Sequence, residues 1–175
     1  MLKGPNIHLR LVKQTDLDMI QVLDEDVYAR GPYFPLMIRT GVSLRASYEK
    51  DGMWGPEVGT MLMVDPADDR ILGSIVYFRG VHYYDAVEIG YIVYRPEDRG
   101  KGYTSEAVKL FARYLLDSKK ISRVQLQAEP GNIASCRVAE KCGFKFEGTA
   151  RSAIMSQGKE LDISVYSLIR DDLVD

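Results

Sequence analysis

Residues 88–107 read Glu88-Ile89-Gly90-Tyr91-Ile92-Val93-Tyr94-Arg95-Pro96-Glu97-Asp98-Arg99-Gly100-Lys101-Gly102-Tyr103-Thr104-Ser105-Glu106-Ala107. The apolar first part predicts a strand over 86–94, and the helical spacing of the apolar residues that follow predicts a helix over 103–117. The first turn of such a helix has free N–H groups and the positive end of the helix dipole, so it can hold a phosphate group. Glycines in the connecting turn let the backbone approach that group closely.

This segment alone leaves two interpretations open. The turn can be an anion site, to which Arg99 and Lys101 add positive charge, or a strand–helix connection that uses Gly100 and Gly102 only for its geometry. Two common nucleotide-binding patterns do not apply, because the chain has neither Gly-x-x-x-x-Gly-Lys-Ser/Thr nor Gly-x-Gly-x-x-Gly.

The rest of the chain predicts a mixed sheet with helices. Alternating or short apolar runs predict strands at 7–12, 60–64, 71–78, 123–128, 144–147 and 162–169. Helical spacing and capping residues predict helices at 15–26, 43–50 and 132–143. Thr15 is expected to open the first helix, with Asp18 in a capping-box-like contact. This order indicates an α/β (α+β) fold, with helices on both faces of a mixed sheet, in one domain spanning 1–175.

Composition argues against several classes of protein. With 23 Lys+Arg against 25 Asp+Glu, the net charge of −2 gives no basic field for nucleic acid. No apolar run approaches the ~20 residues of a membrane span, and the start of the chain lacks the apolar core of a signal peptide. Cys136 and Cys142 are interpreted as small buried residues, without the His/Cys cluster of a metal site. We expect a cytoplasmic protein without metal, nucleic acid or membrane.

The turn resembles motif A of the GNAT superfamily of N-acetyltransferases. That motif is Arg/Gln-x-x-Gly-x-Gly/Ala, and the chain has Arg99-Gly100-Lys101-Gly102-Tyr103-Thr104, with Thr104 in place of the usual Gly or Ala. Further blocks are similar to the RimJ/RimL-like branch of the superfamily, namely Ile7-His8-Leu9-Arg10-Leu11, Glu88-Ile89-Gly90-Tyr91, Asn132-Ile133-Ala134-Ser135, Gly143-Phe144-Lys145-Phe146-Glu147-Gly148 and Tyr166-Ser167-Leu168 after Asp162. Residues 28–59 carry no comparable match.

The resemblance implies a GNAT fold in which acetyl-CoA, the co-substrate, lies between two splayed parallel strands, 86–94 and 123–128. Main-chain groups would pair with the pantetheine arm at Ile92, Val93 and Tyr94. Main-chain N–H groups would hold the pyrophosphate at Arg99, Gly100, Lys101, Gly102, Tyr103 and Thr104. Asn132 would hydrogen-bond the pantetheine, or act as a plain helix N-cap, or both. Ser135 would protonate the departing CoA sulfur, or be a small residue of the capping region.

The implied chemistry is direct attack of a primary amine on the thioester in a ternary complex. Glu88 is the leading candidate for the base, directly or through a water, and its alternative is a solvated or ion-paired strand residue. Glu129 and Asp162 are weaker candidates for the base. An acyl-cysteine intermediate on either cysteine is the minority mechanism.

The acceptor is expected to bind near residues 28–59, an irregular segment rich in glycine, proline and aromatic residues. Candidate acceptor contacts are Tyr33, Phe34, Trp54 and His82, although aromatics in such a segment can equally cover an edge of the core. The acceptor could be a protein N-terminus, a polyamine or other small amine, or an antibiotic amine. Alternatives are a non-catalytic acyl-CoA-binding regulatory module and a different acyl donor such as succinyl-CoA. A homodimer is compatible with the resemblance, since many relatives are dimers.

Overall fold

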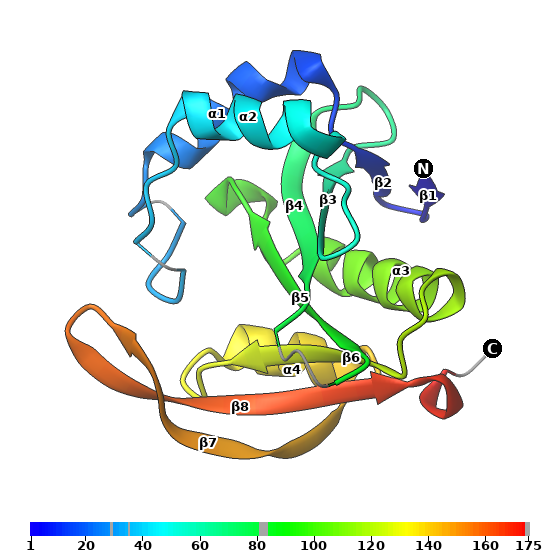
Figure 1. The fold of residues 1–175 in the computed structure, drawn as a ribbon, viewed down its shortest axis with the longest axis vertical. Coiled ribbons are helices and arrows are strands. Elements are labelled where there is room, and N and C mark those ends of the chain that lie inside the picture. Colours follow the sequence, from blue (N-terminus) through cyan, green and yellow to red (C-terminus); the bar gives the residue numbers. More distant parts are fainter. Residues whose placement is uncertain (29, 35, 81–83, 174–175) are drawn as a thin grey trace.

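The computed structural model describes residues 1–28, 30–34, 36–80 and 84–173. An eight-stranded sheet in the order β1-β2-β3-β4-β5-β6-β8-β7 runs through the molecule (Figure 1). The strands are β1 (Leu2–Lys3), β2 (His8–Leu11), β3 (Val58–Val64), β4 (Ile71–Phe78), β5 (Ala86–Val93), β6 (Arg123–Ala128), β7 (Lys145–Ser156) and β8 (Lys159–Ile169). The helices are α1 (Leu17–Glu25), α2 (Gly41–Asp51), α3 (Tyr103–Ser118) and α4 (Ile133–Lys141), with short 3₁₀ turns η1 (Gln14–Asp16), η2 (Pro96–Asp98) and η3 (Arg170–Asp172).

Strands β5 and β6 run parallel and share only a short register. Ala86 pairs with Arg123, and Glu88 pairs with Gln125 at the end of the contact. Beyond these residues the two strands diverge, and Figure 1 shows β5 leaving β6 at a wide angle. The other neighbouring strands of the described chain pair antiparallel. The expected splayed parallel pair is therefore confirmed.

Helices cover both faces of the sheet, as expected. On one face, α3 and α4 pack on a core that includes Ile75, Val87 and Phe111. On the other face, α1 and α2 pack on a second core that includes Leu44, Leu62 and Ile92. Apolar side chains at helical spacing bury a stripe of α1 and of α3 against the sheet, whereas α2 and α4 each bury one residue, Leu44 and Ala139.

The start of the first helix differs from the prediction. The 3₁₀ turn η1 precedes α1, which begins at Leu17, so Thr15 and Asp18 do not form the expected cap. Asp16 instead accepts hydrogen bonds from the Lys13 N–H at 2.7 Å and from Arg10. Sequence reasoning missed this because the partner, Arg10, comes from a neighbouring strand.

The last two strands are much longer than the predicted segments 144–147 and 162–169. Most β7 residues are exposed, so no apolar alternation marks that strand. The hairpin turns at Gln157 and Gly158, both with positive φ (50° and 74°). Glycine favours that conformation, so the Gln-Gly pair was the available signal. The two-residue strand β1 was also not predicted.

Candidate active site

Glu88 stands at the point where β5 and β6 part. Its neighbours Val87 and Ile89 face the α3 side of the sheet and are buried there, so Glu88 projects from the opposite face. The side chain is half-buried. Burial penalises the charged carboxylate and raises the pKa of Glu88 from 4.5 to about 7. A carboxyl with that pKa can exchange protons near neutral pH.

Gln125 lies directly opposite Glu88 in the strand register, and sequence reasoning missed it. Its neighbours Val124 and Leu126 pack with α3 and α4, so Gln125 faces the same side of the sheet as Glu88. Only 8% of Gln125 is exposed. A glutamine between apolar residues is ordinary on a solvated strand face, so only its burial makes it stand out.

The diverging strand β5 exposes main-chain groups toward the gap. Tyr94 N–H donates to the Leu72 carbonyl of β4 at 3.1 Å. Because main-chain groups alternate in direction along a strand, Ile92 also points toward β4, whereas Tyr91 and Val93 point toward the gap beside β6. Of the three predicted pantetheine contacts, the structure therefore turns Val93 toward the gap and turns Ile92 and Tyr94 toward the sheet.

The turn before α3 has the geometry of a phosphate cradle. Gly100 and Gly102 have φ values of 74° and 85°, and no heavy atom lies within 4 Å of the position where a Cβ would stand. Gly102 is the N-cap of α3 and supplies no side chain, so the first N–H groups of that helix, at Tyr103 and Thr104, have no side-chain cap from it. An open backbone with unsatisfied N–H groups fits a pyrophosphate.

The charged residues of this turn are tied to the protein. The guanidinium of Arg99 donates to the carbonyls of Val93 and Tyr94 at 3.3 Å each. Lys101 lies 3.4 Å from Asp98, a carboxylate that is only 2% exposed. These side chains therefore shape the turn, while its main chain remains available for a ligand.

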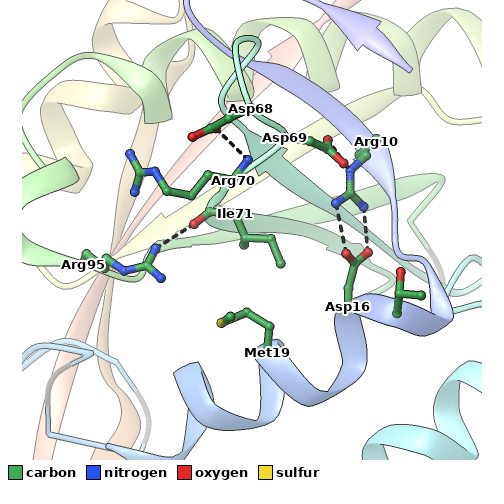
Figure 2. A pocket seen from close by; sticks show the side chains of 9 residues that line it. Arg10, Asp16, Met19, Asp68, Asp69, Arg70, Ile71 and Arg95 are labelled. Carbon is green, nitrogen blue, oxygen red and sulfur yellow. Dashed lines mark hydrogen bonds and ion pairs between the residues drawn. The ribbon is translucent and has the colours of Figure 1, made fainter.

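The base of the turn is anchored to the beginning of β4. Asp98 accepts two hydrogen bonds from Arg70, at 2.7 and 3.2 Å. Arg95 donates to the Ile71 carbonyl at 2.9 Å, on one side of a hollow beside α1 (Figure 2). These contacts tie the turn to the beginning of β4.

Asn132 and Ser135 lie at the start of α4. The Asn132 side chain accepts the Ser135 N–H at 3.2 Å, so the expected N-cap is confirmed. The Ser135 hydroxyl lies 2.7 Å from the Tyr91 hydroxyl of β5. Tyr91 was not predicted as a site residue, although it lies in the block 88–91. Burial raises its pKa to about 12, so its proton stays bound at neutral pH.

The predicted aromatic contacts separate in space. The Tyr33 hydroxyl donates to the Gly131 carbonyl at 2.9 Å, so this part of the α1–α2 connection touches the turn that leads to Asn132. Phe34 packs against the core under α1 and α2. Trp54 instead packs against Tyr77, at 5.3 Å between ring centroids, on the α3 side of the sheet. His82 lies outside the described residues.

Other candidate groups are used elsewhere. Asp162 accepts the Ser152 N–H at 2.9 Å within the β7–β8 hairpin. Cys142 is buried, as expected, and burial raises its pKa to about 11, which disfavours the nucleophilic thiolate. Cys136 is half-buried, and both thiols are free.

In the described chain we find no His/Cys/Asp/Glu group suited to a metal and no helix that could cross a membrane.

Comparison with known proteins reveals clear relatives. A family model described as an acetyltransferase (GNAT) domain matches residues 6–145. The chain is 28% identical over 183 residues to the probable N-acetyltransferase YjcK of Bacillus subtilis (strain 168), covering 98% of each chain. It is 33% identical over 102 residues to the putative ribosomal N-acetyltransferase YdaF of the same bacterium, covering 56% of this chain and 55% of that one.

Solved structures share the fold over nearly the whole chain. A GNAT-family acetyltransferase from Bacillus anthracis superposes with a TM-score of 0.80 at 23% identity, covering 97% of this chain and 98% of that chain. Spermidine N-acetyltransferase from Vibrio cholerae, in complex with CoA and spermine, superposes with a TM-score of 0.78 at 18% identity and the same coverage. At such identities the superpositions establish the common fold.

Proposed function

The chain belongs to the GNAT acetyltransferase family, and from that premise we propose that it transfers an acetyl group from acetyl-CoA to a primary amine. The amine attacks the thioester directly in a ternary complex. The observation that carries this proposal is Glu88, a half-buried carboxyl with a pKa of about 7 at the point where β5 and β6 part. We also propose that residues 1–175 act as one domain in the cytoplasm, where two free cysteines are expected.

Glu88 acts as the general base in this proposal. A lysine-like amine with a pKa near 10.4 is neutral in only about one molecule in 10³ at pH 7, so removal of its proton limits the attack. At that pH a group with a pKa of about 7 is about half ionised and can accept the proton directly or through one water. The alternative interpretation is a solvated or ion-paired strand residue. Glu88 has no ion pair in the described chain, and the activity of Glu88→Gln tests the solvated alternative.

The gap between β5 and β6 provides groups for the thioester. The main-chain N–H groups of Tyr91 and Val93 point toward it and can stabilise the developing oxyanion. Ser135 can donate its proton to the departing sulfur. The 2.7 Å hydrogen bond to the Tyr91 hydroxyl fixes the position of the Ser135 hydroxyl. Through this bond Tyr91 can replace the proton that Ser135 gives to the sulfur.

The turn before α3 would hold the pyrophosphate of acetyl-CoA through main-chain N–H groups of 99–104. The fit is supported by the open space at Gly100 and Gly102 and by the uncapped first turn of α3. Two solved GNAT neighbours contain CoA or acetyl-CoA, which agrees with this assignment. Arg99 and Lys101 add positive charge while shaping the turn.

The acceptor is a small or peptidic amine in this proposal. Structural neighbours include enzymes described as acting on spermidine and on a ribosomal-protein alanine, so the fold accommodates both kinds of acceptor. Tyr33 is the described aromatic residue best placed to line the acceptor site, because it touches the turn before Asn132.

The test measures thiol release from acetyl-CoA with a panel of N-terminal peptides, polyamines and aminoglycosides. We expect release to depend on one class of amine and to fall about 10²-fold or more in Glu88→Gln, with unchanged acetyl-CoA affinity by calorimetry. Tight acetyl-CoA binding without release for any amine would favour a regulatory module over an enzyme. No binding of acetyl-CoA or succinyl-CoA would refute the proposal.

A further inference from the structure

Two polar side chains lie next to each other at the parting of β5 and β6. Among the described residues, neither the carboxyl of Glu88 nor the carboxamide of Gln125 has a hydrogen-bond partner, although Gln125 is only 8% exposed. A nearly buried amide without a partner in the protein can complete its hydrogen bonds only with water or with a bound ligand.

The polar neighbours of Gln125 do not relieve it, because they pair with one another. Ser167, its register partner on β8, bonds to the carboxylate of Glu147. Arg123, two residues earlier on β6, lies 3.1 Å from the same carboxylate. Gln125 is thus left between this satisfied cluster and Glu88.

A ligand can reach the carboxamide. In the described part of the protein, the side-chain N and O atoms that are fully buried without a hydrogen-bond partner all belong to arginines. The Gln125 carboxamide is not among them, so it keeps an opening to the surface. It faces away from α3 and α4, on the face from which Glu88 also projects.

We propose that Gln125 is an acceptor-binding residue, whose carboxamide hydrogen-bonds the amine-bearing substrate beside Glu88. This inference rests on the proposed acetyl transfer. The carboxamide oxygen can accept an N–H of the amine, and its NH₂ can donate to an oxygen next to that amine. A neutral amide also leaves the amine free to lose its proton, whereas a second carboxylate would hold it as an ammonium and would raise the pKa of Glu88 further.

The kinetic test compares Gln125→Leu with Gln14→Leu. Gln14 is an exposed glutamine on η1, away from β5 and β6, which makes it a control for the loss of a carboxamide. With the best amine of the panel, Gln125→Leu should raise the acceptor KM about tenfold and leave the acetyl-CoA KM unchanged, while Gln14→Leu changes neither more than about twofold. Gln125→Glu should move the midpoint of the rate–pH profile upward, which a purely structural residue would not do.

Thermal unfolding without substrates separates a structural role from this one. If Gln125 is unsatisfied in the free protein, Gln125→Leu should keep or raise the melting temperature. A fall of several degrees, an unchanged acceptor KM, or an equal effect of Gln14→Leu would overturn the inference.

A binding test distinguishes failure of this inference from failure of the proposed function. The side-chain NH₂ signals of Gln125, assigned by their loss in Gln125→Leu, are followed by NMR in the CoA-bound protein during titration with glycinamide, spermidine and kanamycin. A shift with one amine supports the contact even if no amine is acetylated. No shift with an amine that the enzyme acetylates, or with any amine, overturns it.

Discussion

Two sets of polar groups removed from solvent have opposite surroundings in this molecule. One is the pair of Arg10 and Asp16 beside α1, and the other is Glu88 and Gln125 at the parting of β5 and β6. Arg10 is 5% exposed and Asp16 8% exposed, and two hydrogen bonds of 2.7 and 3.0 Å join them (Figure 2). Glu88 and Gln125 lie side by side in register without a hydrogen-bond partner in the described chain.

The pKa values of the two carboxyls express this difference. Burial acts to raise the pKa of Asp16, but hydrogen bonds from Arg10 and the Lys13 N–H outweigh it, so the pKa is lowered. Burial alone acts on Glu88 and raises its pKa to about 7. A buried carboxyl with a cationic partner stays ionised, and removing one member of such a pair is costly, whereas a carboxyl without a partner holds its proton to higher pH. Pairing, more than burial, therefore distinguishes the Arg10–Asp16 pair from the groups to which we assign the proposed function.

The largest effect should come from breaking the paired set. Asp16→Asn removes the more buried of the two carboxylates that pair with Arg10, while the other, Asp69, remains. It should cost about 3 kcal/mol of unfolding free energy at pH 7, measured by urea denaturation. The loss should shrink as the pH falls below about 3.8, because the unfolded carboxyl is then protonated and the folded one, whose pKa is lowered, follows at still lower pH. Asp18→Asn is the control, because that side chain is 85% exposed and its pair with Arg45 is worth at most about 1 kcal/mol. Equal losses would contradict the comparison.

The unpaired carboxyl should show the opposite dependence on pH. Folded Glu88 holds its proton up to about pH 7, above the ordinary 4.5, so wild-type stability falls as the pH rises through this range. Glu88→Gln removes that loss, and its stability relative to wild type should improve by roughly 2–3 kcal/mol between pH 4.5 and pH 8. Urea denaturation at both pH values measures it. A constant difference would mean that the Glu88 pKa is not raised.

The Tyr91–Ser135 pair tests whether a polar group with a hydrogen-bond partner can also be functional. The two hydroxyls are bonded to each other and yet lie at the gap between β5 and β6. Ser135→Ala should lower kcat about tenfold, or roughly 1.4 kcal/mol, by removing the proton donor to the sulfur. Its melting temperature should stay within about 2 °C of wild type. Ser118→Ala, at a hydroxyl that bonds the Tyr114 carbonyl at the end of α3, should leave kcat unchanged. A loss of stability without a loss of kcat would assign Ser135 a structural role.

The smallest effect concerns the Tyr33 hydroxyl, a partnered group on the rim of the site. Tyr33→Phe removes its hydrogen bond to the Gly131 carbonyl and should raise the acceptor KM about three- to fivefold, or roughly 0.7–1 kcal/mol. Tyr28→Phe, in the same connection and 79% exposed, should change the acceptor KM less than twofold. Identical behaviour of the two variants would remove Tyr33 from the site.

The sequence by itself determined the elements whose signals are local. The predicted strands 71–78 and 123–128 match β4 and β6, and the predicted helix 103–117 ends one residue short of α3. Periodicity and chain-breaking residues act within a few positions, so they can be read without a partner strand. The resemblance to GNAT acetyltransferases rested on short blocks of the same local kind, and the family match confirms it.

Only the tertiary structure decided which polar groups are paired. Arg10 reaches Asp69, 59 residues away, as well as Asp16, and the register that sets Gln125 opposite Glu88 joins strands 37 positions apart. The lengths of β7 and β8 were underestimated for a related reason. An exposed strand is held by main-chain hydrogen bonds to its neighbour and has no apolar pattern of its own to mark it in the sequence. Burial and pairing are properties of residues brought together by folding. The sequence could therefore name Glu88 as a candidate base, but it could not show that its neighbour is a buried glutamine without a hydrogen-bond partner among the described residues.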